Sequence, residues 1–77
     1  MWIKAENYIR EFNGLVQYAL IGRYEYGVFE ETYGPKWTLR KRPVDKNNEA
    51  LDSWGFPLFY FNTKKALISK TETFLKI

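Results

Sequence analysis

Strand-like alternation of apolar and polar residues runs through most of the chain. The segments that we expect to form strands are residues 2–5, 8–12, 15–21, 24–28, 37–42 and 56–61. Asn13-Gly14 separates two of them, and Asn-Gly between apolar runs is the strongest short-range signal for a β-hairpin, because a type I′ turn needs positive φ at both central residues. No crossover helix separates the runs, so the pattern predicts a twisted, mostly antiparallel sheet of about four to six strands.

The apolar period changes to that of a helix near the C-terminus. We expect Asn62 or Thr63 to cap a helix that runs to about Lys76. The apolar residues of this helix follow the stripe of a surface helix facing a core: Leu67, Ile68, Thr71, Phe74 and Leu75. The prediction is a single α+β domain over residues 1–77, with one C-terminal helix at about residues 63–76 packed on one face of the sheet.

The chain carries more apolar strand surface than one helix can cover. Residues 15–21 and 56–61 place apolar side chains on both faces of the sheet, whereas the helix covers only one face. The polar loop at residues 44–55 is either mobile or held by a helical turn at Ala50-Leu51 and by Trp54. Sheet curvature, this loop, a second copy of the chain or a partner protein are the candidates for covering the second face.

Composition removes several functional classes. The chain has no Cys and no His, so it has no disulfides, no thiolate metal site, no thiol nucleophile and no histidine general base. It contains neither of the glycine-rich phosphate-binding patterns of nucleotide-binding proteins. We therefore expect a protein that is not an enzyme and that needs no cofactor or metal. No apolar segment has the pattern of a secretory leader or a membrane span, so we expect a cytoplasmic protein.

Charge is divided unevenly along the chain, whose net charge is +3. Residues 1–35 hold three basic and five acidic side chains, and residues 36–77 hold nine basic and four acidic ones. The acidic patch of Glu25, Glu30 and Glu31 contains candidate acid–base or cation-binding carboxylates. Adjacent residues of a strand point to opposite faces, so the pattern does not favour a carboxylate pair at Glu30 and Glu31.

The basic half supplies a candidate contact for an anion or a nucleic acid. Its residues are Lys36, Arg40, Lys41, Arg42, Lys64 and Lys65. The first four lie on one predicted β-strand beside Trp37. Basic residues interleaved with aromatic ones are typical of proteins that bind single-stranded nucleic acid. The alternation nevertheless points Trp37 towards the core. The last two head the helix, where free backbone N–H groups and the helix dipole attract anions. The alternative for all six is a solvated surface.

The two ends of the chain carry a resemblance. Trp2-Ile3 and Phe61-Asn62-Thr63-Lys64-Lys65-Ala66-Leu67 are similar to the opening strand and the strand-to-helix junction of a loose class of small uncharacterised bacterial and phage proteins. The resemblance implies a compact domain with a sheet and a helix. Lys64-Lys65 replaces the acidic pair usual after the Thr in that class, and no functional residue is carried over.

Taken together, these patterns favour a small binding or regulatory protein. The first hypothesis is contact with a protein partner or self-association through the apolar surplus. The alternative is a nucleic-acid-binding module that uses the basic strand and the start of the helix. We expect no membrane partner.

Overall fold

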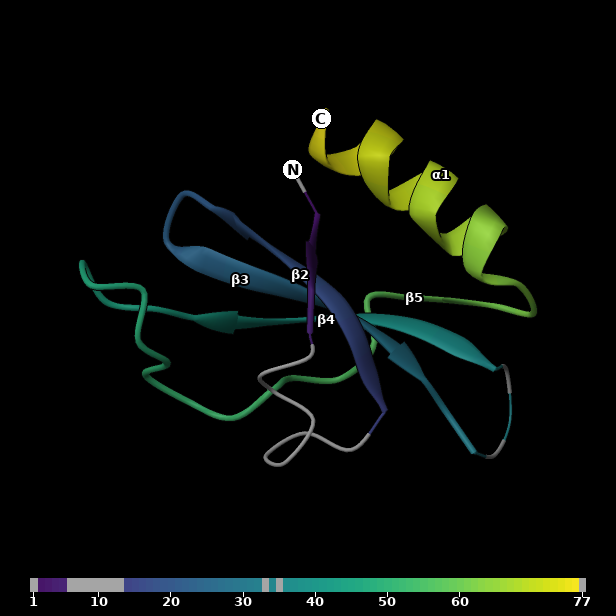
Figure 1. Cartoon of the computed structure of the whole chain (residues 1–77), viewed down its shortest axis with the longest axis horizontal. Helices are drawn as coiled ribbons and strands as arrows, with labels where there is room; N and C mark the ends of the chain where they lie inside the picture. The colour runs from purple at the N-terminus through teal and green to yellow at the C-terminus, as the bar shows by residue number, and fades with distance from the viewer. Residues whose placement is uncertain (1, 6–13, 33, 35, 77) are drawn as a thin grey trace.

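The computed structural model describes residues 2–5, 14–32, 34 and 36–76. It contains a sheet of five antiparallel strands in sequence order and one helix on one face of that sheet (Figure 1). The elements are β1 (Ile3–Lys4), β2 (Leu15–Ile21), β3 (Tyr24–Glu30), β4 (Trp37–Pro43), β5 (Phe59–Phe61) and α1 (Lys64–Leu75). The predicted α+β class, antiparallel sheet and C-terminal helix are confirmed.

Strands β2, β3 and β4 form the centre of the sheet, and the pairing of β2 with β3 shifts register once, between Leu15 and Gln17. β2 has the predicted bounds, and β3 and β4 extend the predicted runs by one or two residues. Gly22 adopts a φ of 62° in the tight turn between β2 and β3, a left-handed conformation that costs glycine nothing. The predicted strand at residues 8–12 and Asn13 of the predicted turn fall outside the described residues, whereas Gly14 is described and has a φ of 93°.

Helix α1 is capped at both ends by its own residues. Thr63 is the N-cap, and its side-chain oxygen accepts a hydrogen bond of 3.2 Å from the backbone N–H of Ala66. Lys76 ends the helix in a left-handed conformation, with a φ of 59°, and its N–H donates to the carbonyl of Glu72. The cap predicted from the Thr is confirmed, since a β-region Thr satisfies one of the free N–H groups of the first turn.

The larger core lies between α1 and the sheet. Its buried residues are Tyr26, Val28, Leu39 and Leu67. The side chains packed around them are Trp2, Ile21, Trp37, Phe59, Phe61, Ile68 and Leu75. Trp37 and Leu39 therefore point to the helix, as the alternation in β4 predicted. Burial, with a smaller contribution from neighbouring Tyr24, raises the pKa of the Tyr26 hydroxyl above its usual value.

A second, smaller core covers the opposite face of the sheet. Ala5, Leu15 and Phe29 are buried there, with Tyr18 and Trp54 packed against them. The Trp54 ring meets Phe29 edge-on, with ring centroids 5.1 Å apart. Trp54 comes from the loop between β4 and β5, so this loop covers part of the face that α1 leaves open.

The loop is held by backbone pairing and not by a helical turn. Val44 and Ala50 form an antiparallel bridge, and the Asp45 side chain accepts hydrogen bonds from the N–H groups of Asn47 and Glu49. The helical turn considered at Ala50-Leu51 is therefore wrong. An Asp that bonds the backbone two residues on stabilises a tight turn, and this local bond competes with helix formation.

Gly27 lies beneath the second core and leaves room for Trp54. A Cβ atom at this position would lie 2.8 Å from Cη2 of Trp54, 2.9 Å from Cδ1 of Leu15 and 2.9 Å from Cε1 of Phe29. We expect Gly27→Ala to lower the free energy of unfolding by about 1–3 kcal/mol, because three packed side chains must shift. Urea unfolding followed by tryptophan fluorescence measures this change.

Gly55→Ala is the matched control for that prediction. Gly55 also lies next to Trp54, but a Cβ there would meet its nearest atom, the carbonyl oxygen of Lys41, at an ordinary 3.5 Å. We expect this variant to unfold within about 0.5 kcal/mol of the unmodified protein. Equal unfolding midpoints for the two glycine variants would show that Trp54 does not pack on Gly27.

Candidate binding surface

The acidic patch and the basic strand predicted from the sequence lie next to each other, because β3 and β4 are neighbouring strands. Three ion pairs join them: Glu25 with Arg42 at 2.5 Å, Glu31 with Arg40 at 3.0 Å, and Glu30 with Lys36 at 3.1 Å. The antiparallel register of β3 and β4 is the cause, since it makes Glu25 and Arg42 direct cross-strand partners. The uneven charge along the chain is thus largely neutralised in space.

Arg42 and Glu25 form the most buried of these pairs. Glu25 is 1% exposed and Arg42 is 6% exposed, and Nε of Arg42 donates to Oε1 of Glu25. The Arg42 guanidinium also lies 4.4 Å from the centre of the Trp54 ring, within the range of a cation–π contact. Arg42 is consequently part of the interior and helps to hold the loop that carries Trp54.

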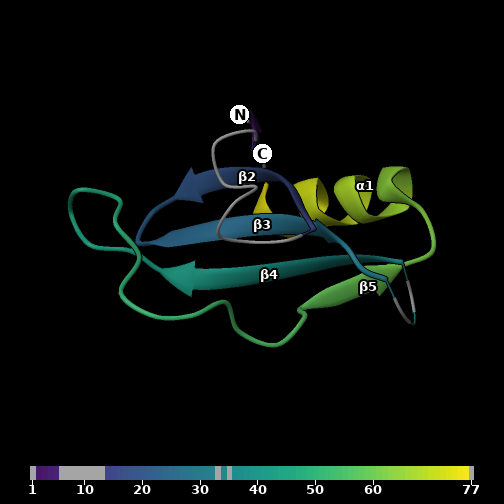
Figure 2. The ribbon, with the colours of Figure 1, turned by 60° about the horizontal axis from the view of Figure 1, so that its bottom comes forward.

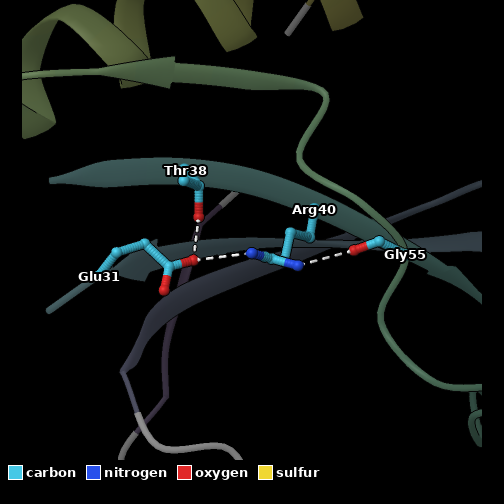
Figure 3. A network of polar contacts seen from close by, with 4 residues as sticks. All are labelled: Glu31, Thr38, Arg40 and Gly55. Atoms are coloured by element: carbon cyan, nitrogen blue, oxygen red, sulfur yellow. Dashed lines mark hydrogen bonds and ion pairs between the residues drawn. The ribbon is translucent and has the colours of Figure 1, made fainter. Parts of the chain in front are cut away.

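Arg40 is the centre of a half-buried polar network (Figure 3). Nη2 of Arg40 donates to Oε1 of Glu31 at 3.0 Å, and Nη1 donates to the carbonyl oxygen of Gly55, also at 3.0 Å. The Thr38 hydroxyl donates to the same Glu31 oxygen at 2.8 Å. Arg40 therefore ties the loop before β5 to the sheet, and its guanidinium is committed to partners within the chain.

Lys36 is the exposed residue of the basic strand, whereas Arg40 and Lys41 are half-buried and Arg42 is buried. Lys36 is paired with Glu30, and more than two fifths of each side chain is exposed. Nζ of Lys41 lies 4.3 Å from the centre of the Tyr24 ring. All four basic residues predicted here thus have partners within the chain. Their contact with an anion or a nucleic acid stays a prediction, and any such ligand would compete with these partners.

Lys64 and Lys65 lie at the start of α1, as the sequence indicated. Both are exposed, and the first turn of the helix has no acidic residue. They line an open hollow of about 560 Å³ together with Ile68, Ser69 and Glu72. None of the four residues of the basic strand lines this hollow. The six candidate residues therefore lie on at least two separate parts of the surface.

The apolar residues before and within β5 are exposed. Phe56 is 92% exposed, Tyr60 is 61% exposed and Leu58 is 37% exposed. We call these three residues the β5 border. Figure 2 shows β5, and the loop that leads into it, along the lower margin of the sheet. The border is the largest departure from the expected burial.

The prediction that residues 56–61 are buried on both faces is therefore wrong. Phe59 and Phe61 pack towards α1, but Tyr60 points to the other face, which the described residues leave uncovered at this margin. The strand is also shorter than predicted. Pro57 has no N–H to donate, and residue-by-residue pairing with β4 begins only at Phe59. Before that point the backbone makes separate bonds to β4, from the N–H of Gly55 to the carbonyl of Lys41 at 3.1 Å and from the N–H of Leu58 to the carbonyl of Leu39 at 2.7 Å.

Strand β5 is an edge strand with unusually little protection. In the described sheet it pairs with β4 on one side only. Natural edge strands are commonly protected by charged side chains, especially Lys, that discourage pairing with another chain. Residues 53–63 contain no charged residue. The signal that predicts this surface from sequence is an uncharged run that contains a Pro just before the strand, since Pro is confined to edges and bulges.

Comparison with known proteins adds no functional information. No protein-family model, curated protein or solved structure matches the chain. Within the described part of the chain, no three acidic side chains are grouped so as to hold a metal ion. No helix in that part combines the length and the apolar character needed to cross a membrane.

Proposed function

We propose that this chain is a small non-enzymatic binding protein that acts in the cytoplasm through a protein–protein contact at the β5 border. The observation that carries the proposal is the 92% exposure of Phe56, which projects a full aromatic side chain into solvent. Leu58 and Tyr60, which follow Phe56 closely in the chain, are also exposed. Aromatic residues dominate the binding energy of protein interfaces, and an edge strand offers backbone groups beside them.

The neutralisation of the basic strand supports this proposal over its nucleic-acid alternative. Arg40 and Arg42, the two residues best suited to bind phosphate, each bond a carboxylate within the chain. Lys64 and Lys65 are the remaining basic candidates. A nucleic-acid-binding protein needs several such cations along one track, and its affinity falls steeply with salt. Titration of the labelled protein with oligonucleotides at low salt tests the alternative through shifts of the Lys64 and Lys65 amide resonances.

Site-directed photo-crosslinking tests the proposed function. A benzophenone amino acid replaces Phe56 in the chain expressed in the cells from which its gene comes. In the matched control it replaces Lys46, an exposed residue of the turn that follows β4. We expect a discrete, saturable protein adduct from position 56 that excess unmodified chain displaces. No adduct is expected from position 46.

The adduct identifies the partner by mass. A heterologous protein or a second copy of the chain would each support the proposal. Diffuse labelling of equal strength at positions 56 and 46 would contradict it, because a non-specific sticky surface gives no saturable product.

A further inference from the structure

We propose that residues 52–57 form a strap that opens from the sheet by itself, and that Arg40 is the clasp that keeps it closed. Figure 2 shows the loop that contains this strap along the margin of the sheet. The strap carries Trp54, which packs on the second core, and Phe56, the most exposed residue of the β5 border. This motion belongs to the free chain, so it goes beyond the proposed function and needs no partner.

Both ends of the strap are fixed to β4, with chain to spare between them. The N–H of Leu51 donates to the carbonyl of Pro43 at 2.9 Å, and the N–H of Leu58 donates to the carbonyl of Leu39 at 2.7 Å. The two donors are seven residues apart along the chain, whereas the two acceptors are four residues apart. Surplus residues in one of two paired segments leave the ladder and bulge. The strap can therefore move away from β4 while both end bonds stay in place.

The middle of the strap is attached through two adjacent residues. The N–H of Gly55 donates to the carbonyl of Lys41 at 3.1 Å, and the Gly55 carbonyl accepts from Nη1 of Arg40 at 3.0 Å. The Trp54 ring packs edge-on against Phe29. Among the described residues, Gly55 forms the only backbone–backbone hydrogen bond between the strap and the sheet. Segments held by so few contacts open locally, at a lower free energy than the whole domain.

The surface beneath Trp54 reduces the cost of opening. Trp54 lies over Gly27, which has no side chain to lose contacts, and its ring centre is 4.4 Å from the guanidinium of Arg42. Arg42 pairs with Glu25, whose Oε2 atom is buried and has no hydrogen-bond partner among the described residues. Water admitted beside Arg42 when the strap opens hydrates a buried charge and recovers part of its desolvation cost. This gain offsets part of the lost Trp54 packing.

Arg40 is the residue that opposes opening. Its Nη1 donates to the Gly55 carbonyl, and its Nη2 donates to the Glu31 carboxylate (Figure 3). The Thr38 hydroxyl donates to the same carboxylate and helps to keep it in place. The side chains of Arg40 and Glu31 are 27% and 30% exposed, so dissolved ions reach the pair. Salt weakens such a pair more than a buried one, and we expect the strap to open more often as ionic strength rises.

Hydrogen exchange of individual amides, followed by NMR, tests for the opening. The Gly55 amide reports on the strap, the Leu51 and Leu58 amides report on its ends, and the Val28 amide reports on the sheet. We expect Gly55 to be the least protected of the four, with an exchange rate insensitive to urea below the unfolding transition. Exchange at Val28 is expected to accelerate with urea, because only global unfolding exposes it.

Two outcomes of this measurement overturn the proposal. Equal protection and equal urea dependence at Gly55 and Val28 would show that the strap opens only when the domain unfolds. Equal protection at Gly55, Leu51 and Leu58 would show that the ends are not fixed and that no separate strap exists.

Arg40→Met tests the clasp, with Lys41→Met as the matched control. Both variants remove a half-buried cation from β4, but the Lys41 side chain lies against Tyr24 and its backbone carbonyl is retained. Loss of a hydrogen bond from a charged donor is expected to speed Gly55 exchange about tenfold to a hundredfold relative to Val28. Lys41→Met is expected to change that ratio by less than about twofold.

A salt series on the unmodified protein tests the clasp without a substitution, should Arg40→Met fail to fold. We expect the ratio of the Gly55 exchange rate to the Val28 exchange rate to rise with sodium chloride. The clasp is ruled out if this ratio responds neither to salt nor to Arg40→Met, or if Lys41→Met raises it as much as Arg40→Met does.

Discussion

Replacing Arg42 with Ala is expected to lower the free energy of unfolding by about 3–5 kcal/mol, a large fraction of the stability of a small domain. The reason is the burial of its partner, because Glu25 is 1% exposed and would keep a carboxylate in the interior without its cation. The variant also removes the cation–π contact with Trp54, 4.4 Å from the guanidinium. Urea unfolding monitored by tryptophan fluorescence and by circular dichroism gives the change.

Lys36→Ala is the matched control for this prediction. It removes a basic residue from the same basic segment and breaks the ion pair with Glu30, but both partners are exposed. Exposed pairs contribute between about 0 and 1 kcal/mol, so we expect a small effect. If the two variants unfold within about 1 kcal/mol of each other, the Glu25–Arg42 pair is not buried as the structure has it.

The double variant Glu25→Leu/Arg42→Leu separates the cost of the unpaired charge from the loss of the contact. Replacing both members of a buried pair with apolar residues is often neutral or stabilising. We expect the double variant to recover most of the stability lost in Arg42→Ala. A loss in the double variant as large as in the single one would show that the pair itself, and not the stranded carboxylate, is responsible.

Local signals in the sequence predict much of this fold. The bounds of β2, the Thr63 cap and the core-facing alternation of Trp37 with Leu39 were all available from spacing and residue type. Each of these features is decided within a few residues of chain. A cap needs only its own oxygen and an N–H three residues on, and alternation needs only the pleat of one strand.

The local sequence pattern does not predict which charged residues pair with each other or become buried. Glu25 and Arg42 are 17 residues apart, and they meet because β3 and β4 pair in one particular register. A shift of one residue would send Arg42 to the opposite face. The exposure of Phe56 was hidden for a similar reason. An apolar strand has the same pattern at the centre and at the margin of a sheet, and strand order decides which face and edge stay open.

Replacing Leu67 with Ala is expected to lower the free energy of unfolding by about 2–5 kcal/mol. Leu67 is fully buried, and it is the residue of α1 that belongs to the buried cluster with Tyr26, Val28 and Leu39 of the sheet. The substitution leaves a cavity at that contact, whereas Ala itself favours the helix more than Leu does. The loss therefore measures packing between helix and sheet. A twelve-residue helix is marginal on its own, so we expect helix and sheet to unfold together.

Leu51→Ala is the control with the same chemical change. Leu51 is 64% exposed in the loop before β5, and we expect its removal to change stability by less than about 0.5 kcal/mol. Helical circular dichroism and tryptophan fluorescence should give coincident urea transitions for Leu67→Ala, shifted to lower urea. A fluorescence transition that stays in place while the helical signal disappears first would show that the sheet is stable without α1. In that case the sheet would be stable by itself, and the core between α1 and the sheet would not be needed for the sheet to fold.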